Sequence, residues 1–234
     1  MGTNARDLNG AISTVSRKAL PPKMKLTYNN CFWLFMVGCI LGVISEGLFT
    51  LWHGGHWESH VTVLWGKLNV LYGAGAVIMY IASKQLDGRK LPTRFTVFCL
   101  VGVAVEYLGA IIQERLFKAE SWDYSGQPLN FANGKISFIF TVFWGILGLA
   151  FMRMIVPELE KGFLHMQTKQ WKISCAVLSV FMLVNIVVST IVLVRWGNRV
   201  TLGTEATNAF VELIDAKYND EYMSTRFMEW IHIQ

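Results

Sequence analysis

The stretch at residues 95–117, FTVFCLVGVAVEYLGAIIQERLF, is apolar over nearly its whole length and carries Glu106 near its middle. At about 1.5 Å per helical residue, it is long enough to cross the ~30 Å hydrocarbon core of a bilayer. An ionised carboxylate at that depth is costly, so such residues normally face a bundle interior, a partner or a water-filled cavity. We therefore predict a polar site enclosed among membrane helices.

Four further apolar runs indicate that this helix is one of several, and they lie at residues 31–52, 68–83, 136–155 and 173–194. The chain is 53% hydrophobic and only 16% charged, which is far from the composition of a soluble globular domain. We predict an all-α fold, a polytopic helical membrane bundle of about five transmembrane helices. The second run is the shortest and is rich in glycine.

Hydropathy also predicts three parts of the chain. Residues 1–28 are polar and contain Pro21-Pro22, so we expect a flexible cytoplasmic tail. Residues 29–194 form the transmembrane bundle, and residues 195–234 an amphipathic extracytoplasmic C-terminal segment. Acids outnumber bases in this last segment, so we expect it to pack over the outer mouth of the bundle or against a partner rather than on anionic lipid.

The distribution of Lys and Arg predicts the orientation. Of the 21 such residues, 13 lie before the first run, between the second and third, or from the end of the fourth (Arg153) to the start of the fifth. These segments are expected to be cytoplasmic, which places the N-terminus inside a multi-pass protein of the cell membrane. Nothing in residues 1–25 resembles a signal peptide.

The net charge of +5 raises the question of a nucleic-acid partner. The basic residues flank membrane segments, and no aromatic-basic recognition motif accompanies them. We therefore expect contact with anionic membrane lipid and no nucleic-acid binding. The four cysteines lie in or beside apolar runs without CxxC spacing, which is typical of packing residues.

Two other acids accompany Glu106. Glu114 follows it by about two helical turns, so both are expected on neighbouring parts of one helix face. Glu46 lies late in the first run, after Gly38 and Gly42 in the GxxxG spacing that lets helices approach closely. The fifth run carries Asn185, which we expect to hydrogen-bond to another helix.

The segment before the second run is unusual for a spanning helix. It reads WGKLNVLYGAG at residues 65–75, with three glycines and with Asn69 and Tyr72 at a depth where polar groups need partners. A broken or re-entrant entry that lines a protein cavity would explain it. Tight helix packing through glycine is the alternative, and the sequence does not separate the two.

A histidine-rich loop, HGGHWESH, follows the first run. Its residues could surround a divalent metal, since imidazole and carboxylate are ordinary zinc or nickel donors. No standard zinc signature is matched, so an interfacial loop is the preferred interpretation and no cofactor is otherwise expected. The candidate metal ligands are His53, His56, Glu58 and His60.

A second polar loop, KAESWDYSGQPLNFANGK, follows the third run. It is too polar to lie in hydrocarbon, and loops held by a rigid scaffold often carry recognition. The fourth run is expected to end before Pro157. Taken with the acids and the glycine-rich entry, the candidate ligand-binding residues are Glu46, Asn69, Tyr72, Glu106, Tyr107, Glu114, Trp122, Asp123, Tyr124 and Asn130.

Over roughly residues 30–157 the chain resembles a bacterial family, the putative ABC-transporter type IV or CmpB membrane proteins. The residues that carry the resemblance are Ser45-Glu46, Gly66, Tyr72-Gly73, Gly75, Glu106-Tyr107, Glu114, Trp122-Asp123-Tyr124-Ser125, Asn130, Gly134-Lys135-Ile136 and Trp144-Gly145. The most specific part is the WDYS loop. Lys67, Val70 and Lys135 depart from the family pattern. The resemblance implies a transport permease.

Three functions are compatible with these patterns. A permease-like protein would use the acids to bind a cation, carry protons or accept substrate ammonium groups. Because the chain has no GxxxxGK[ST] phosphate loop, ATP-driven transport would need a separate ATPase subunit. The alternatives are a membrane-embedded enzyme acting on a lipid-linked substrate, or a scaffold or sensor subunit with an extracytoplasmic partner or a second copy of itself. No catalytic residue is predicted, because HExxH and GxSxG motifs are absent.

Overall fold

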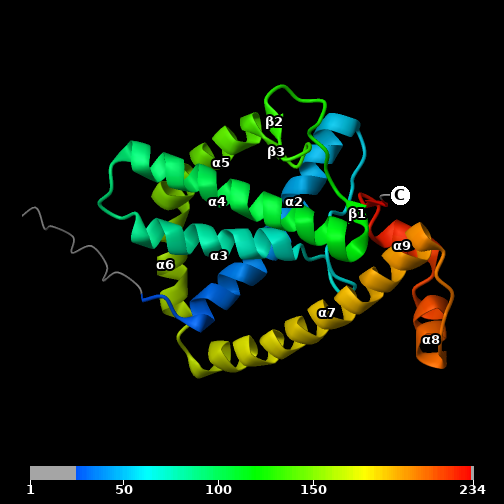
Figure 1. Ribbon diagram of the computed structural model, residues 1–234. Coiled ribbons are helices and arrows are strands. Elements are labelled where there is room, and N and C mark those ends of the chain that lie inside the picture. Colours follow the sequence, from blue (N-terminus) through cyan, green and yellow to red (C-terminus); the bar gives the residue numbers. More distant parts are fainter. Residues whose placement is uncertain (1–24, 233–234) are drawn as a thin grey trace, which may run out of the picture.

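The computed structural model describes residues 25–232 and is mostly helical, which confirms the all-α class. Its helices are α2 (Tyr28–Gly54), α3 (Val70–Gln85), α4 (Leu91–Ile112), α5 (Phe138–Ala150), α6 (Val156–His165), α7 (Lys169–Leu202), α8 (Ala209–Lys217) and α9 (Asp220–Arg226), with π-helical turns η1 (Gln113–Phe117) and η2 (Phe151–Ile155). Short strands β1 (Ala119–Glu120), β2 (Asn130–Phe131), β3 (Ile136–Ser137) and β4 (Ile231–His232) complete it (Figure 1).

Within residues 25–232, four helical stretches are long and apolar enough to cross a membrane. They are Tyr28–Gly54, Leu91–Phe117, Phe138–His165 and Lys169–Leu202, and they contain the first, third, fourth and fifth predicted runs. The second predicted run appears as α3, which has only 16 residues. Five full-length spans are therefore not confirmed. Most of the predicted N-terminal tail lies outside the described residues.

The helices run between two ends of the bundle, and we name each end after an element that lies there. The α6 end holds the start of α2, where Asn29 donates to the carbonyl of Met166, just after α6. The hairpin end holds the β2–β3 pair, β1, α8 and α9 (Figure 1). The chain therefore enters the described bundle at one end and finishes at the other.

Glycine allows the first helices to pack closely. A Cβ on Gly38 would lie 2.9 Å from the Cβ of Ala76, and a Cβ on Gly42 would overlap the ring of Tyr72. On the other side of the bundle, the ring of Trp144 lies against Gly102. The GxxxG prediction for α2 is thus confirmed as a close α2–α3 contact, because side chains at either glycine would separate the helices.

The residues before α3 are not helical, and they are buried at both ends of residues 61–69 but exposed at Trp65, Gly66 and Lys67. The amide of Asn69 donates to the carbonyl of Cys39 at 3.0 Å, which is inside α2, and the amide of Thr62 donates to Leu68 at 3.1 Å. Residues 61–69, which we name the entry segment, thus reach the middle of the bundle before α3 begins. Such backbone is tolerated at membrane depth only where protein surrounds it.

Asn185 holds the entry segment from the side of α7. Its carboxamide donates to the carbonyl of Trp65 at 2.8 Å and accepts from the amide of Trp65 at 3.2 Å. Ser189, one turn further along α7, accepts from the amide of Leu64 at 2.8 Å. Asn185 and Ser189 are fully buried. The expectation that Asn185 would bond to another helix was wrong, because its partner is the backbone of the entry segment.

Helical structure continues beyond Pro157, contrary to the prediction that the fourth helix ends before it. The stretch from α5 passes through η2 into α6 and ends at His165. Pro157 lies in the first turn of α6, where its fixed φ is compatible with a helix. In the π-helical turn η2, directly before α6, the backbone hydrogen bonds span five residues instead of four.

The chain after α7, residues 204–232, folds back onto the hairpin end, and we name it the C-terminal cap. Asp215 on α8 accepts two bonds from Arg195, at 2.9 and 2.6 Å, and one from Arg199 at 2.5 Å. Arg199 also bonds to Asp220 at 2.6 Å. The amphipathic pattern is therefore two short helices, broken near Tyr218, and not one.

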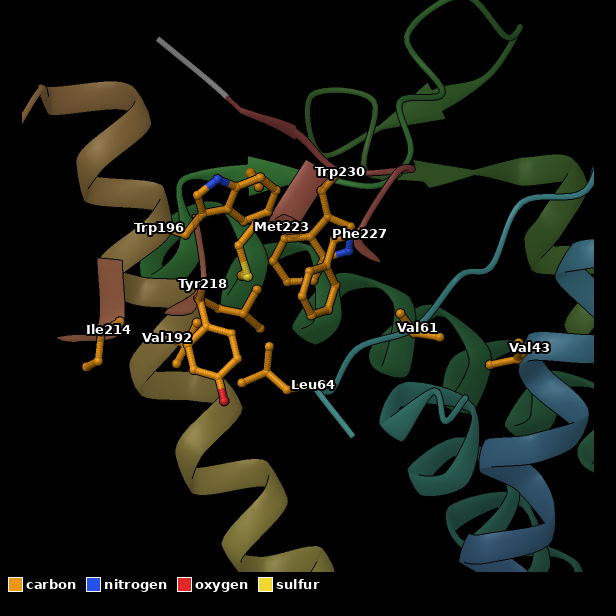
Figure 2. Packing of buried hydrophobic residues seen from close by; sticks show 12 residues of the cluster. Val43, Val61, Leu64, Val192, Trp196, Ile214, Tyr218, Met223, Phe227 and Trp230 are labelled. Atoms are coloured by element: carbon orange, nitrogen blue, oxygen red, sulfur yellow. The ribbon is translucent and has the colours of Figure 1, made fainter. Parts of the chain in front are cut away.

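The cap buries an apolar cluster against the bundle. Figure 2 shows Phe227 and Trp230 of the cap gathered near Trp196 of α7. Beyond this cluster, β4 pairs antiparallel with β1, and the Arg226 guanidinium donates to the carbonyls of Val63 and Gly66 in the entry segment. The cap therefore contacts α7, the entry segment and β1, which follows the Leu91–Phe117 span.

Candidate functional site

Glu106 lies on α4 with only 6% of its surface exposed. Its Oε1 accepts a hydrogen bond from the hydroxyl of Tyr124 at 3.3 Å, and its Oε2 has no hydrogen-bond partner among the described residues. A buried carboxylate oxygen without a partner loses its hydration without compensation. A ligand or a proton on Glu106 would offset this cost.

Glu46 makes the same kind of pair from the neighbouring helices. The hydroxyl of Tyr72, in the first turn of α3, donates to Glu46 Oε1 on α2. Gly42, one turn before Glu46, gives the Tyr72 ring its space. The glycine-rich start of α3 thus positions a tyrosine hydroxyl on an acid from another helix.

The two pairs lie near one another. Tyr72 is within electrostatic reach of Tyr124 and Glu106, and Tyr124 is within reach of Glu46. We name these four residues the acid site. Each comes from a different element: α2, α3, α4 and the loop before β2. Of the predicted ligand-binding residues, these are the ones that the structure brings together.

Aromatic rings from α5 border the acid site. The ring of Phe140 stacks on Tyr124 with centroids 4.9 Å apart, and the Trp144 indole lies beside the Glu106 carboxyl. The Nε1 of Trp144 is buried and faces this carboxyl, although neither it nor Glu106 Oε2 makes a hydrogen bond of ordinary geometry within the part of the chain that the structure describes. Sequence reasoning missed both rings as site residues, because aromatics in an apolar helix look like ordinary lipid-facing or packing side chains.

No basic side chain neutralises the acid site. The ion pairs found in residues 25–232 involve neither Glu46 nor Glu106. Two hollows in this range lie elsewhere, beside the α6-end half of α2 and in the C-terminal cap. Within the described chain, each acid of the acid site is hydrogen-bonded to its tyrosine and has no cationic partner.

Two of the predicted site residues lie apart from this group. Glu114 is in the π-helical turn η1 and pairs with Lys135 at 3.0 Å, with 41% of its side chain exposed. Tyr107 is also 41% exposed and points away from the buried side of α4 that carries Glu106. The Glu114–Lys135 ion pair thus connects the end of the Leu91–Phe117 span to the loop that follows it.

The WDYS loop is held in shape by its own polar side chains. Asp123 accepts from the amide and the hydroxyl of Ser125 at 2.8 and 2.6 Å, and these bonds hold the pKa of that carboxyl below its usual value. Trp122 donates to the carbonyl of Lys135 at 3.2 Å, and Asn130 to that of Gln127 at 2.7 Å. These residues fix the loop and so place the Tyr124 hydroxyl.

Asn69 has a comparable supporting role. Its side chain caps α3 by accepting from the amides of Leu71 and Tyr72, and it donates to the carbonyl of His60 at 2.9 Å. An asparagine at the N-cap stabilises a helix start. Asn69 therefore holds the first turn of α3, and with it Tyr72, in place.

The histidine-rich loop does not form a cluster of donors. His53 stacks on Phe49 with centroids 5.7 Å apart, while His56 and His60 both face Glu58, at 2.8 and 3.5 Å. The Gly54 carbonyl and the Glu58 carboxylate raise the pKa of His56. Throughout residues 25–232, no three His, Cys, Asp or Glu side chains lie together as a metal site would require.

Glu229 of the C-terminal cap is a further acid that sequence reasoning did not single out. Burial and the nearby carboxylates of Glu58 and Glu46 raise its pKa to about 8. Its Oε2 is buried without a partner in the described chain. The only signal in the sequence was an acid next to Trp230 in an apolar pattern, and nothing there indicates its approach to Glu46.

A second glutamate–tyrosine pair lies at the α6 end. The hydroxyl of Tyr80 on α3 donates to Glu160 Oε1 on α6 at 3.2 Å, and Lys84 forms an ion pair with the same carboxylate. We name these three residues the α6-end latch. Here the acid has a cationic partner, so its charge is neutralised within the protein.

The four apolar helices, the non-helical entry segment and the internal acids are features of a helical membrane protein. A family model described as "Putative ABC-transporter type IV" matches residues 33–190, which is more than half of the chain. The chain belongs to this family, as the resemblance noted from the sequence predicted. No curated protein and no solved structure matches it.

Proposed function

We propose that the protein is a permease-like subunit whose acid site binds a cation during transport. The observation that carries this proposal is Glu106, a buried membrane carboxyl with an unpaired oxygen and no cationic side chain beside it. Intramembrane acids of this kind usually mark ion or substrate pathways. The family description, which names a transporter type, supports the same function.

The entry segment supports the proposal from the geometry of the backbone. Transporters commonly place their binding sites where a spanning segment is interrupted near the middle of the bundle. Here the interruption ends at Asn69, and Tyr72 of the next turn reaches Glu46. A cation at Glu46 or Glu106 would therefore lie beside irregular backbone that can rearrange more readily than a continuous helix.

Energy for transport would come from a partner in this proposal. The chain has no phosphate-binding loop, so an ATPase subunit would have to bind to it. Purification in mild detergent tests this part, because a permease subunit should retain a stoichiometric ATPase. Orientation in the cell membrane with the N-terminus in the cytoplasm belongs to the same proposal.

Binding of cations to purified protein in nanodiscs tests the site itself. We expect at least one ion from a panel of sodium, potassium and small alkylammonium ions to raise the thermal unfolding temperature of the native chain, because a ligand that binds only the folded state stabilises it. The Glu106→Gln variant should keep its helical content and monodispersity but lose this stabilisation.

Glu221→Gln is the matched control, because Glu221 lies on the exposed face of α9. This variant should bind as the native chain does. Equal stabilisation of the native chain and the Glu106→Gln variant, or no stabilisation of either by any ion of the panel, would overturn the proposed cation site.

A further inference from the structure

The acid site contains two carboxyl groups and each has its own tyrosine. Glu46 accepts from Tyr72 and Glu106 from Tyr124, so neither acid depends on the other for its hydrogen bond. No basic side chain of residues 25–232 pairs with either acid, so a single ligand with two positive charges would neutralise both carboxylates at once.

A divalent metal is a poor match for this arrangement. Zinc sites gather three or four protein donors around one point, and no such group of His, Cys, Asp and Glu occurs in the described chain. The two acids stand on different helices with a tyrosine ring attached to each. The two charges of the ligand are therefore better placed on separate atoms.

The walls between the acids are aromatic. Tyr72, Tyr124 and the rings of Phe140 and Trp144 surround the carboxyls. Aromatic faces attract ammonium groups through their quadrupoles and pack well against methylene groups. Such a surface suits a flexible chain that is apolar in the middle and charged at both ends.

Two further acids extend this pattern toward the hairpin end. Glu229 is within electrostatic reach of Glu58 and Glu46, and Glu58 follows the end of α2. Arg226 is within electrostatic reach of Glu229, and its guanidinium donates to the carbonyls of the entry segment. Glu229 and Glu58 therefore place two further carboxyl groups on the hairpin side of Glu46.

We propose that the acid site binds a linear aliphatic diamine, with one ammonium group on Glu106 and the other on Glu46. This inference rests on the proposed function, since it names the class of cation that the site takes. Each ammonium replaces or joins the tyrosine hydroxyl on its carboxyl, and the methylene chain lies against the rings. A monoamine would leave one carboxylate without a counter-charge, and this is most unfavourable when the one left is the buried Glu106.

A chain-length series provides the test. The affinities of α,ω-diamines from three to six carbons are compared with those of the n-alkylamines of equal length, by calorimetry on the purified protein in nanodiscs. We expect at least one diamine to bind about tenfold or more tightly than its monoamine counterpart, because the second ammonium meets the second carboxylate.

Single variants of the two acids then separate the charges. In Glu46→Gln and in Glu106→Gln, the advantage of the diamine over the monoamine should fall to less than about threefold, since either change leaves one carboxyl. Glu114→Gln is the matched control, because Glu114 lies in the same span but pairs with Lys135, and its diamine advantage should be unchanged.

The outcomes distinguish this inference from the proposed function. If monoamines and diamines bind equally to the native chain and both are lost in Glu106→Gln, the cation site stands and the diamine is overturned. If neither amines nor inorganic ions bind in a way that depends on Glu106, both proposals fail.

Discussion

The acid site and the α6-end latch use the same pair of residue types at opposite ends of the bundle. In each, a tyrosine hydroxyl of α3 or the WDYS loop donates to a glutamate on another element. The difference lies in the charge. Glu160 has Lys84 as a counter-ion, whereas the acid site has no cationic side chain among the described residues. The latch is therefore complete within the protein, and the acid site needs something added.

The presence of a counter-ion at the latch and its absence at the acid site predict different effects of substitutions. A satisfied buried ion pair mainly costs stability when one partner is removed. An acid that lacks a partner can be neutralised by substitution without breaking any ion pair. Substitutions at the latch should thus affect folding first, and substitutions at the acid site should affect binding first.

The largest expected effect is that of Lys84→Met. The Lys84 and Glu160 side chains are 18% and 17% exposed, so the remaining Glu160 carboxylate would be mostly buried without a counter-ion. We expect a loss of about 2–4 kcal/mol in the free energy of unfolding. Thermal unfolding in detergent measures it, and the Lys84→Met, Glu160→Gln double variant should recover part of the loss.

The control for this pair is Lys161→Met, because Lys161 and Glu158 form an ion pair that is more than half exposed on both sides. Its effect should stay below about 1 kcal/mol. If Glu106→Gln destabilises the fold as strongly as Lys84→Met does, the division between latch and acid site is wrong.

A second effect, that of Glu229→Gln, depends on pH. Burial and the carboxylates of Glu58 and Glu46 raise the pKa of Glu229 from 4.5 to about 8 in the folded state. The folded chain therefore holds a proton on Glu229 that the unfolded chain releases between these values, so stability falls as pH rises from about 4.5 to about 8. Below this range, both states are protonated and the contribution is fully present.

Unfolding temperatures between pH 5 and pH 9 show whether this dependence exists. The native chain should lose stability relative to Glu229→Gln as the pH increases, and Glu221→Gln should follow the native curve. Parallel curves for the native chain and Glu229→Gln would show that Glu229 keeps an ordinary pKa.

The smallest effects concern the tyrosine hydroxyls. Tyr80→Phe removes a donor to Glu160 at 3.2 Å and should cost about 1 kcal/mol of stability. Tyr124→Phe removes a longer bond to Glu106, at 3.3 Å, and should cost less while weakening cation binding. A greater loss of stability in Tyr124→Phe than in Tyr80→Phe would reverse the comparison.

Much of the acid site was accessible from the sequence, because charges in apolar runs are conspicuous. Glu46, Glu106, Tyr72 and Tyr124 were all predicted as site residues, and the structure brings them together. Their proximity follows from the fold, since an apolar helix gives no periodic signal for which face is turned inward. The rotation of α5 that brings Trp144 to Glu106 could not be predicted for the same reason.

Other features depend on contacts that no local pattern encodes. Lys84 and Glu160 are 76 residues apart, and each looks like an ordinary charge near a helix end. Glu114 was expected on the same face as Glu106, but the π-helical turn at Gln113–Phe117 changes the direction of its side chain. The irregular entry segment was one of two predicted alternatives, and its partner Asn185 became evident only from the structure.

The bonds from Arg226 to the entry segment have a consequence for biogenesis. The carbonyls of Val63 and Gly66 are synthesised early, but the guanidinium that they accept from leaves the ribosome after every spanning helix. During translation, therefore, these two acceptors must rely on water or on the translocation machinery. The entry segment therefore reaches its final position only after Arg226 has been synthesised. A polypeptide that ends before Arg226 should still insert into the membrane, but its entry segment should not reach that position.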